Sequence, residues 1–156
     1  MKGATLDIEL RLATENDADI LATLMAEMDD EESAPAHASD SASVKAVLAD
    51  MAQYPNFRAY LVFENKVAVA SFTLMIFSSP SHHGAPQAML DAVVVTPARR
   101  GAGIGETMIE RALAIATEAG CYKMMLSSNL KRMDAHRFYE RIGFTQHGIS
   151  FAIALS

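Results

Sequence analysis

The sequence predicts a single α/β (α+β) domain, residues 1–156, in which helices pack on a mixed sheet. Segments with strand-like alternation and segments with helical spacing of apolar residues follow one another along the whole chain. The 156 residues suffice for one hydrophobic core and are too few for two ordinary domains. Apolar residues make up 51% of the chain and charged residues 21%, which is typical of a folded globular protein and not of a disordered one.

Apolar periodicity locates the elements of the first half of the chain. In residues 6–12 apolar and charged side chains alternate, which favours a half-buried strand. Thr14 followed by Asp17 is typical of a helix N-terminus, and apolar residues then recur at helical spacing as far as Met28. A polar, proline-containing stretch separates this helix from a second one. Two strands rich in β-branched and aromatic residues follow, and the polar link 64–66 between them favours a hairpin turn.

Glycine and proline mark the boundaries in the second half. Residues 78–86 read as a loop, and the run Met89–Val95 suits a strand buried on both faces. A helix then stops at Gly120, and a later one closes with Gly143 and Phe144, as in a glycine C-cap with a hydrophobic contact. In order, the expected elements are strand Leu6–Leu12, a helix from Asp17 to Met28, helix Ser43–Tyr54, strands Arg58–Phe63, Val67–Phe77 and Met89–Val95, helix Gly103–Ala119, strand Tyr122–Leu126, helix Arg132–Ile142 and strand Phe151–Leu155.

Charge and composition exclude several classes of protein. The formal net charge of −6 argues against nonspecific nucleic-acid binding, which needs a basic surface. No apolar stretch is long enough to span a bilayer, and the N-terminus lacks the apolar core of a signal peptide. The single cysteine, Cys121, allows no intrachain disulfide and fits a reducing compartment. We therefore expect a cytoplasmic protein without nucleic-acid or membrane partners. The scarcity of Cys and His clusters predicts no metal site.

The segment Val93–Gly105 is the most informative part of the sequence. Its glycines let the backbone turn tightly just before a helix, whose first N–H groups lack partners and attract anions. This pattern predicts a phosphate-bearing ligand, with a ligand-free βα turn as the alternative. A Walker loop is excluded because Glu106 stands where that motif has Lys. A dinucleotide fingerprint is excluded because the spacing differs and no acidic residue follows about 20 residues later.

Two motifs resemble those of the GNAT superfamily of N-acetyltransferases. Arg100-x-x-Gly103-x-Gly105, after three valines, is similar to the family's acetyl-CoA signature, and Ala135–Phe144 is similar to its A-x-x-F-Y-E-x-x-G-F motif. The resemblance covers nearly the whole chain. It implies a mixed, mostly antiparallel sheet of about six to seven strands flanked by about four helices. It also implies acetyl transfer from acetyl-CoA to a primary amine of a small molecule or peptide, by direct attack in a ternary complex, with CoA as product. Family members are often homodimers.

The resemblance also assigns cofactor-binding roles. The backbone of β-strand residues Val93 and Val95 would pair with the pantetheine arm where two parallel strands splay apart. Backbone N–H groups after Arg100 would hold the pyrophosphate. Asn129 lies near a position where the family has an Asn, although its spacing to Ala135 is six residues rather than three. The implied cofactor-binding residues are Val93, Val94, Val95, Arg100, Gly101, Ala102, Gly103, Ile104, Gly105, Glu106 and Asn129.

Two residues are candidates for proton transfer. Tyr139 is the candidate general acid by resemblance, although its helical stripe with Phe138 and Ile142 also fits a core position. Asp91 is the candidate general base, because it is the one acid in an apolar segment, where burial would raise its pKa. An ordinary solvated acid is the alternative for Asp91. Cys121 reads as a small apolar residue and not as a nucleophile.

The acidic stretch is the only clue to the acceptor. Asp29, Asp30, Glu31 and Glu32 follow a helix C-terminus, where negative charge is unfavourable, so they are candidates for binding a cationic amine such as a polyamine, an aminoglycoside-like amine or a basic peptide N-terminus. A solvated acidic loop is the alternative. A non-catalytic acyl-CoA-binding sensor or interaction module remains the competing functional class, and a plain structural domain is a third.

Overall fold

The computed structural model describes residues 6–28 and 40–155, which form one five-stranded sheet. The strands lie in chain order: β1 (Ile8–Leu12), β2 (Phe57–Glu64), β3 (Val67–Phe77), β4 (Gln87–Val95) and β5 (Met124–Met125). The first four pair antiparallel, and β5 pairs parallel with β4. The expected mixed, mostly antiparallel sheet is therefore confirmed, with fewer strands in the described part of the chain than the six to seven expected.

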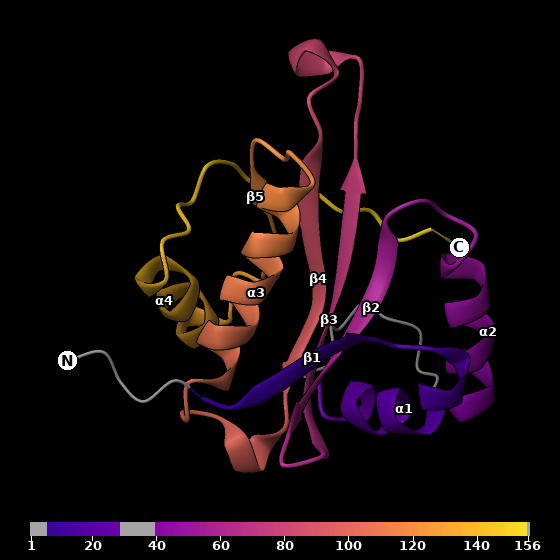
Figure 1. Ribbon diagram of the computed structural model, residues 1–156. Helices are drawn as coiled ribbons and strands as arrows, with labels where there is room; N and C mark the ends of the chain where they lie inside the picture. Colours follow the sequence, from indigo (N-terminus) through magenta and orange to yellow (C-terminus); the bar gives the residue numbers. More distant parts are fainter. Residues whose placement is uncertain (1–5, 29–39, 156) are drawn as a thin grey trace.

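Four α-helices cover the two faces of the sheet. Figure 1 shows α1 (Ala18–Ala26) and α2 (Ser41–Met51) on one side, and α3 (Ile104–Glu118) and α4 (Met133–Arg141) on the other. Each side has its own core, because each helix pair buries one apolar face against the sheet. None of the described helices is long and apolar enough to cross a membrane. The α3 core includes Phe72, Leu90, Ile104, Met108 and Ile109, and the α1–α2 core includes Leu21, Leu24, Leu48, Leu61 and Val94.

Local signals account for the ends of several elements. The Asp17 carboxylate accepts hydrogen bonds from the Thr14 N–H (2.8 Å) and from both terminal nitrogens of Arg11 (2.8 Å each). This partly buried ion pair lowers the pKa of Asp17 to about 2, mainly through the hydrogen bond from Arg11. At the other ends, Gly120 and Gly143 have φ values of +79° and +110°, as C-terminal glycines require. The predicted start of α1 and stops of α3 and α4 are confirmed.

The predicted strand Phe151–Leu155 is wrong. The segment has no strand pairing in the structure, and its alternating apolar side chains are exposed. Alternation describes which face a strand would bury, but a strand also needs an unpaired edge to bond with, and the local pattern does not encode that edge. The strand expected over Tyr122–Leu126 is also shorter, since only Met124 and Met125 pair with β4.

A β-bulge in β4 changes which face of the sheet its side chains enter. Thr73 of β3 faces Asp91 and Ser71 faces Val94, so two residues of β4 oppose the single residue between them. One of the two, Ala92, has a φ of +49°, in the left-handed region that L-residues rarely adopt. Before the bulge, Leu90 packs on the α3 side, whereas after it Val94 packs on the α1–α2 side. The bulge thereby turns Val93 and Val95 toward α3 and α4.

The expectation that the strand Met89–Val95 is buried on both faces is wrong. Leu90 and Val94 are buried, but Met89 and Asp91 are exposed. A strand at which the alternation switches cannot bury both faces throughout its length. The tip of the hairpin between β3 and β4 extends beyond the body of the molecule (Figure 1), and its residues 81–84 are exposed.

The free energies of unfolding of Ala92 variants should reveal the backbone strain at the bulge. Ala92→Val should lower the free energy of unfolding by about 2 kcal/mol, because a β-branched side chain tolerates the left-handed region poorly. Ala92→Gly should leave it within about 1 kcal/mol of wild type, since relief of strain is offset by the greater freedom of the unfolded chain. Denaturant titration measures both values. Equal stability of the two variants would contradict the strained backbone.

Candidate functional site

The glycine turn presents unpartnered amide groups at the start of α3. Gly103 caps the helix with a φ of +86°, and the first N–H in the helical ladder is that of Thr107, which donates to the Gly103 carbonyl (3.1 Å). The N–H groups of residues 101–106 therefore have no backbone acceptor in the described part of the chain. Several N–H donors at the positive end of a helix form an anion-binding site.

The second part of the site is the free edge of β4. Its pairing with β5 is limited to Ala88 with Met124 and Met89 with Met125. Beyond Met89 the two strands are no longer paired, so the backbone of Val93–Val95 faces an open space. This is the splay that the sequence led us to expect. An extended ligand chain can add to such an edge as an extra strand does.

A cavity of about 640 Å³ joins the free edge to the glycine turn. Its walls come from β4, the turn before α3 with the first turn of that helix, α4 with the two residues before it, and Met28 just after α1. The volume is in the range of ordinary ligand sites. The lining residues are Met28, Val93, Val94, Val95, Arg99, Arg100, Gly101, Gly103, Gly105, Glu106, Lys131, Arg132, Met133, Asp134, Ala135, Phe138, Tyr139 and Arg141. Eight of the eleven predicted cofactor-binding residues are among them.

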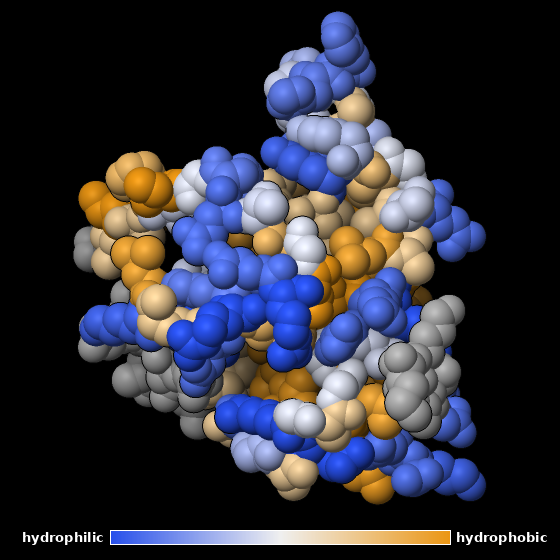
Figure 2. Space-filling model, turned by 90° about the vertical axis from the view of Figure 1, so that its left-hand side faces the viewer, coloured by the Kyte–Doolittle hydropathy of each residue, from blue (hydrophilic) through white to orange (hydrophobic). Residues whose placement is uncertain are grey.

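The cavity is rich in basic side chains although the whole chain is acidic. Five of its lining residues are basic and two are acidic. Arg99 contributes little net charge, because it forms a bidentate ion pair with Glu64, with both distances at 2.7 Å. Basic side chains thus outnumber acidic ones in the lining, and such a lining favours an anionic ligand. Figure 2 shows hydrophilic side chains across the middle of the face that carries α4, bordering hydrophobic patches.

Tyr139 lines the same cavity as the free edge of β4. Its ring packs edge-on against Phe138 (5.2 Å between centroids) and Phe144 (5.7 Å). Burial raises the pKa of Tyr139 above its ordinary value, although the nearby positive charge of Arg132 opposes this shift. The phenol therefore stays protonated at neutral pH and keeps a proton to donate. Tyr139 is thus both part of the α3-side core and part of the cavity, so the two alternatives from the sequence are compatible.

Two of the other predicted site residues, Asp91 and Asn129, are not among the residues that line the cavity. Asp91 is exposed, so the burial on which its role as a base depended is absent. Asn129 uses its side-chain oxygen locally, to accept the N–H of Lys131 (2.9 Å). The half-buried Cys121 has its thiol pKa raised by burial, which disfavours a reactive thiolate. The acidic stretch 29–32 falls outside the described residues.

Sequence reasoning missed several residues of the site. Lys131, Arg132 and Arg141 line the cavity from the α4 side, and no motif distinguishes them from ordinary helix-surface cations. Glu27 and Ser128 each have a buried side-chain oxygen, Oε2 and Oγ, without a hydrogen-bond partner in the described structure. Buried polar atoms without partners are rare in native proteins, so both are candidates for ligand contacts. Only the tertiary structure reveals them.

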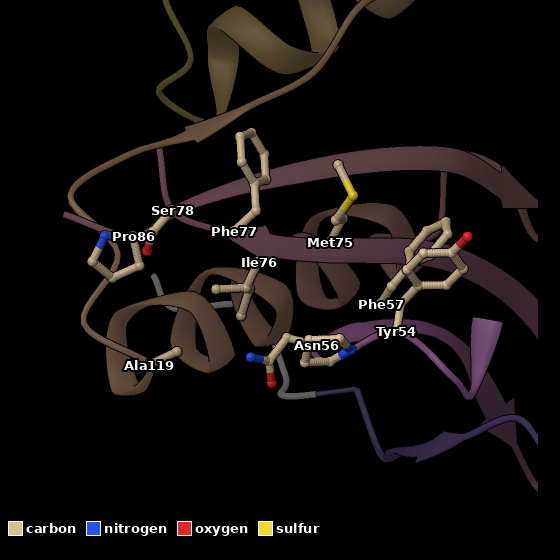
Figure 3. Close-up of a pocket in the computed structure, with 10 residues that line it drawn as sticks. Tyr54, Asn56, Phe57, Met75, Ile76, Phe77, Ser78, Pro86 and Ala119 are labelled. Carbon is tan, nitrogen blue, oxygen red and sulfur yellow. The ribbon is translucent and has the colours of Figure 1, made fainter. Parts of the chain in front are cut away.

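A second cavity, of about 480 Å³, lies at the other end of β3. Figure 3 shows Met75 and Phe77 on one side of this strand and Ile76 on the other, with the rings of Tyr54 and Phe57 close together. None of the described residues that line it is acidic or basic. It therefore lacks a charged side chain for binding a charged ligand.

The family model of the acetyltransferase (GNAT) family matches residues 15–144. The chain belongs to this family. It is therefore an acetyltransferase, and acetyl-CoA is its acetyl donor. The family expected from the two sequence motifs is therefore confirmed.

Two relatives of this acetyltransferase have names that state their acceptor substrate. Aminoalkylphosphonate N-acetyltransferase of Salmonella typhimurium is 33% identical over 147 residues, which cover 94% of this chain and 91% of the relative. Glucosamine 6-phosphate N-acetyltransferase of Trypanosoma brucei brucei is 38% identical over 79 residues, and the chain spans about half the length of that relative. Among solved structures, a putative acetyltransferase from Agrobacterium tumefaciens has a TM-score of 0.76 at 33% identity, covering 93% of this chain and 98% of that one.

The residues around the cavity fit acetyl-CoA. The amide groups of the glycine turn suit a pyrophosphate, and the free edge of β4 suits the amide-containing pantetheine arm. Space at Gly105 is also needed, because a Cβ there would lie 3.2 Å from the ring of Phe138. We expect Gly101–Glu106 and Val93–Val95 to hold the donor when it is bound.

Gly103→Ala should weaken CoA binding about 10-fold or more. The left-handed backbone at this position disfavours any Cβ, so the turn would re-form with its amide groups pointing apart. Calorimetric titration with CoA measures the effect. Gly120→Ala is the matched control, since Gly120 has a similar φ of +79° at the opposite end of α3. A similar loss of affinity in both variants would mean that strain and not the turn is responsible.

Proposed function

We propose that this acetyltransferase transfers the acetyl group from acetyl-CoA to the primary amine of a small molecule that also carries a phosphonate or phosphate group. The observation that carries the proposal is the basic cavity, which joins the glycine turn, the free β4 edge and Tyr139 in a chain whose net charge is −6. The direct attack of the amine in a ternary complex is part of the same proposal.

The arrangement of the cavity supports direct transfer. Acetyl-CoA supplies a thioester whose carbonyl carbon accepts the amine and whose sulfur leaves as a thiolate. Val93 and Val95, on the free edge of β4, would orient the donor through backbone hydrogen bonds. Tyr139 would donate its phenolic proton to the leaving sulfur, and the amine would lose its protons to water and to the tyrosinate, which restores the phenol. Asp91 has no part in this scheme, because it is exposed and outside the cavity.

The acceptor class rests on two supports. Two relatives, as their names state, act on an aminoalkylphosphonate and on glucosamine 6-phosphate, so both acceptors combine an amine with an acidic phosphorus group. In this chain Lys131, Arg132 and Arg141 line the cavity from the α4 side, where they could attract such an acidic group. The acceptor proposed here carries a positive amine and a negative phosphorus group, whereas the acidic stretch 29–32 suggested an acceptor with positive charge alone.

Tyr139→Phe should lower kcat about 100-fold while the Kd for CoA stays unchanged, because only the proton donor is removed. The wild-type kcat should fall only above pH 10, since burial raises the pKa of Tyr139 from its ordinary value of 10.0 and the protonated phenol is the active form. The variant should lack this alkaline decline. Steady-state rates as a function of pH test both expectations.

Tyr60→Phe is the control for this substitution. Burial also raises the pKa of Tyr60, but this residue stacks on Phe72 (5.0 Å) and lies outside the cavity. Its variant should keep the wild-type kcat and pH profile. An unchanged kcat in Tyr139→Phe would remove the proposed proton donor.

A panel of acceptors tests the substrate class. The value of kcat/KM for 2-aminoethylphosphonate should exceed that for propylamine by at least about 10-fold, because one charge-assisted contact contributes on that order. Spermidine and a tripeptide should be poorer acceptors than the phosphonate. A preference for spermidine would instead support the acidic stretch 29–32 as the acceptor site.

A further inference from the structure

An arginine joins the end of α1 to the end of β4. Arg100 donates from Nε to the carbonyl of Val95 (3.0 Å) and from one terminal nitrogen to the carbonyl of Glu27 (3.2 Å). Glu27 is the C-cap of α1, where carbonyl groups lack helical partners and a cation is favourable. The guanidinium therefore fixes the backbone of Glu27 beside the strand that borders the cavity.

One oxygen of the Glu27 carboxylate is left without a partner. Its Oε2 is buried, and no hydrogen bond reaches it in the described structure. A carboxylate at a helix C-terminus is also opposed by the helix dipole. Both features are unfavourable for folding, and a buried acceptor without a donor costs on the order of 1–3 kcal/mol. Glu27 combines a buried acceptor without a donor and a negative charge at a helix C-terminus, and no compensating contact among the described residues offsets them. Such a residue is a candidate for a ligand contact.

The position of Glu27 indicates which ligand group is near. The next residue, Met28, lines the cavity and packs in the same apolar cluster as Val94 of β4. α1 lies on the opposite side of the sheet from α4, which carries Tyr139 (Figure 1). Glu27 itself is not a lining residue, but Arg100 holds its backbone beside the end of β4, on the opposite side of the sheet from the helix that carries the proton donor.

We propose that the carboxylate of Glu27 binds the ammonium group of the acceptor, an inference that rests on the proposed acetyltransferase function. An ammonium group offers three N–H donors and a positive charge, which would satisfy Oε2. Together with the basic residues of the α4 side, Glu27 would make the cavity select a zwitterion. Arg100 acts as a positioning residue, because it holds the backbone of Glu27 and not its carboxylate.

Binding of two analogues to the complex with CoA tests the proposal independently of turnover. Glu27→Gln keeps the shape of the side chain and removes its charge. The variant should bind 2-aminoethylphosphonate at least about 10-fold more weakly than wild type, and 2-hydroxyethylphosphonate equally well. KM for the amine should rise similarly. The Kd for CoA should stay unchanged, and the thermal midpoint should be equal to or above that of wild type.

A matched control and three contrary outcomes complete the test. Glu118→Gln, at the exposed end of α3, should change none of these quantities. Equal affinity of wild type and Glu27→Gln for the amine would overturn the role of Glu27. So would a lower thermal midpoint with weaker binding of both analogues, because that pattern indicates a structural role. Wild type that binds neither analogue, yet acetylates propylamine or spermidine, would overturn the acceptor class and this inference together, while leaving acetyl transfer intact.

Discussion

The separation of β4 from β5 is the constraint on which the rest of the site depends. Only two residue pairs join β4 and β5 in the described structure. Toward the C-terminal end of β4, the backbone of Val93–Val95 has no partner on the side that faces β5. A buried sheet edge is unfavourable unless something bonds to it, so the free edge is stable only as a ligand site or in contact with water. The bulge at Ala92 contributes, because it turns Val93 and Val95 toward the helices that form the remaining walls.

Electrostatics in the cavity differ from those of the whole molecule. The chain is acidic, yet basic side chains predominate around the glycine turn and α4. Two arginines that are neighbours in sequence have different partners. Arg99 is neutralised by Glu64, and Arg100 bonds to two backbone carbonyls and keeps its charge. Formal charge counted along the sequence is therefore a poor guide to the charge that a ligand meets.

Much of the site follows from short-range sequence patterns. The glycine turn, the helix after it and the Phe-Tyr motif are contiguous segments whose geometry is set by local backbone preferences, and residues of all three line one cavity. The burial expected for Asp91 is absent for a local reason. Its apolar neighbours suggested burial, but the alternation of β4 leaves Met89 and Asp91 exposed ahead of the bulge. Lys131, Arg132 and Arg141 were missed because cations on a helix carry no motif.

The sequence by itself determined the order of the elements, the helix caps and the family, since these depend on residues close together in the chain or on motifs of fixed spacing. Only the tertiary structure decided that residues 151–155 remain unpaired, that β4 bears a bulge and that Glu27 lies beside the cavity with a buried oxygen lacking a partner. Each of these depends on contacts between residues that are distant in sequence. The local pattern of apolar and charged residues does not specify such contacts.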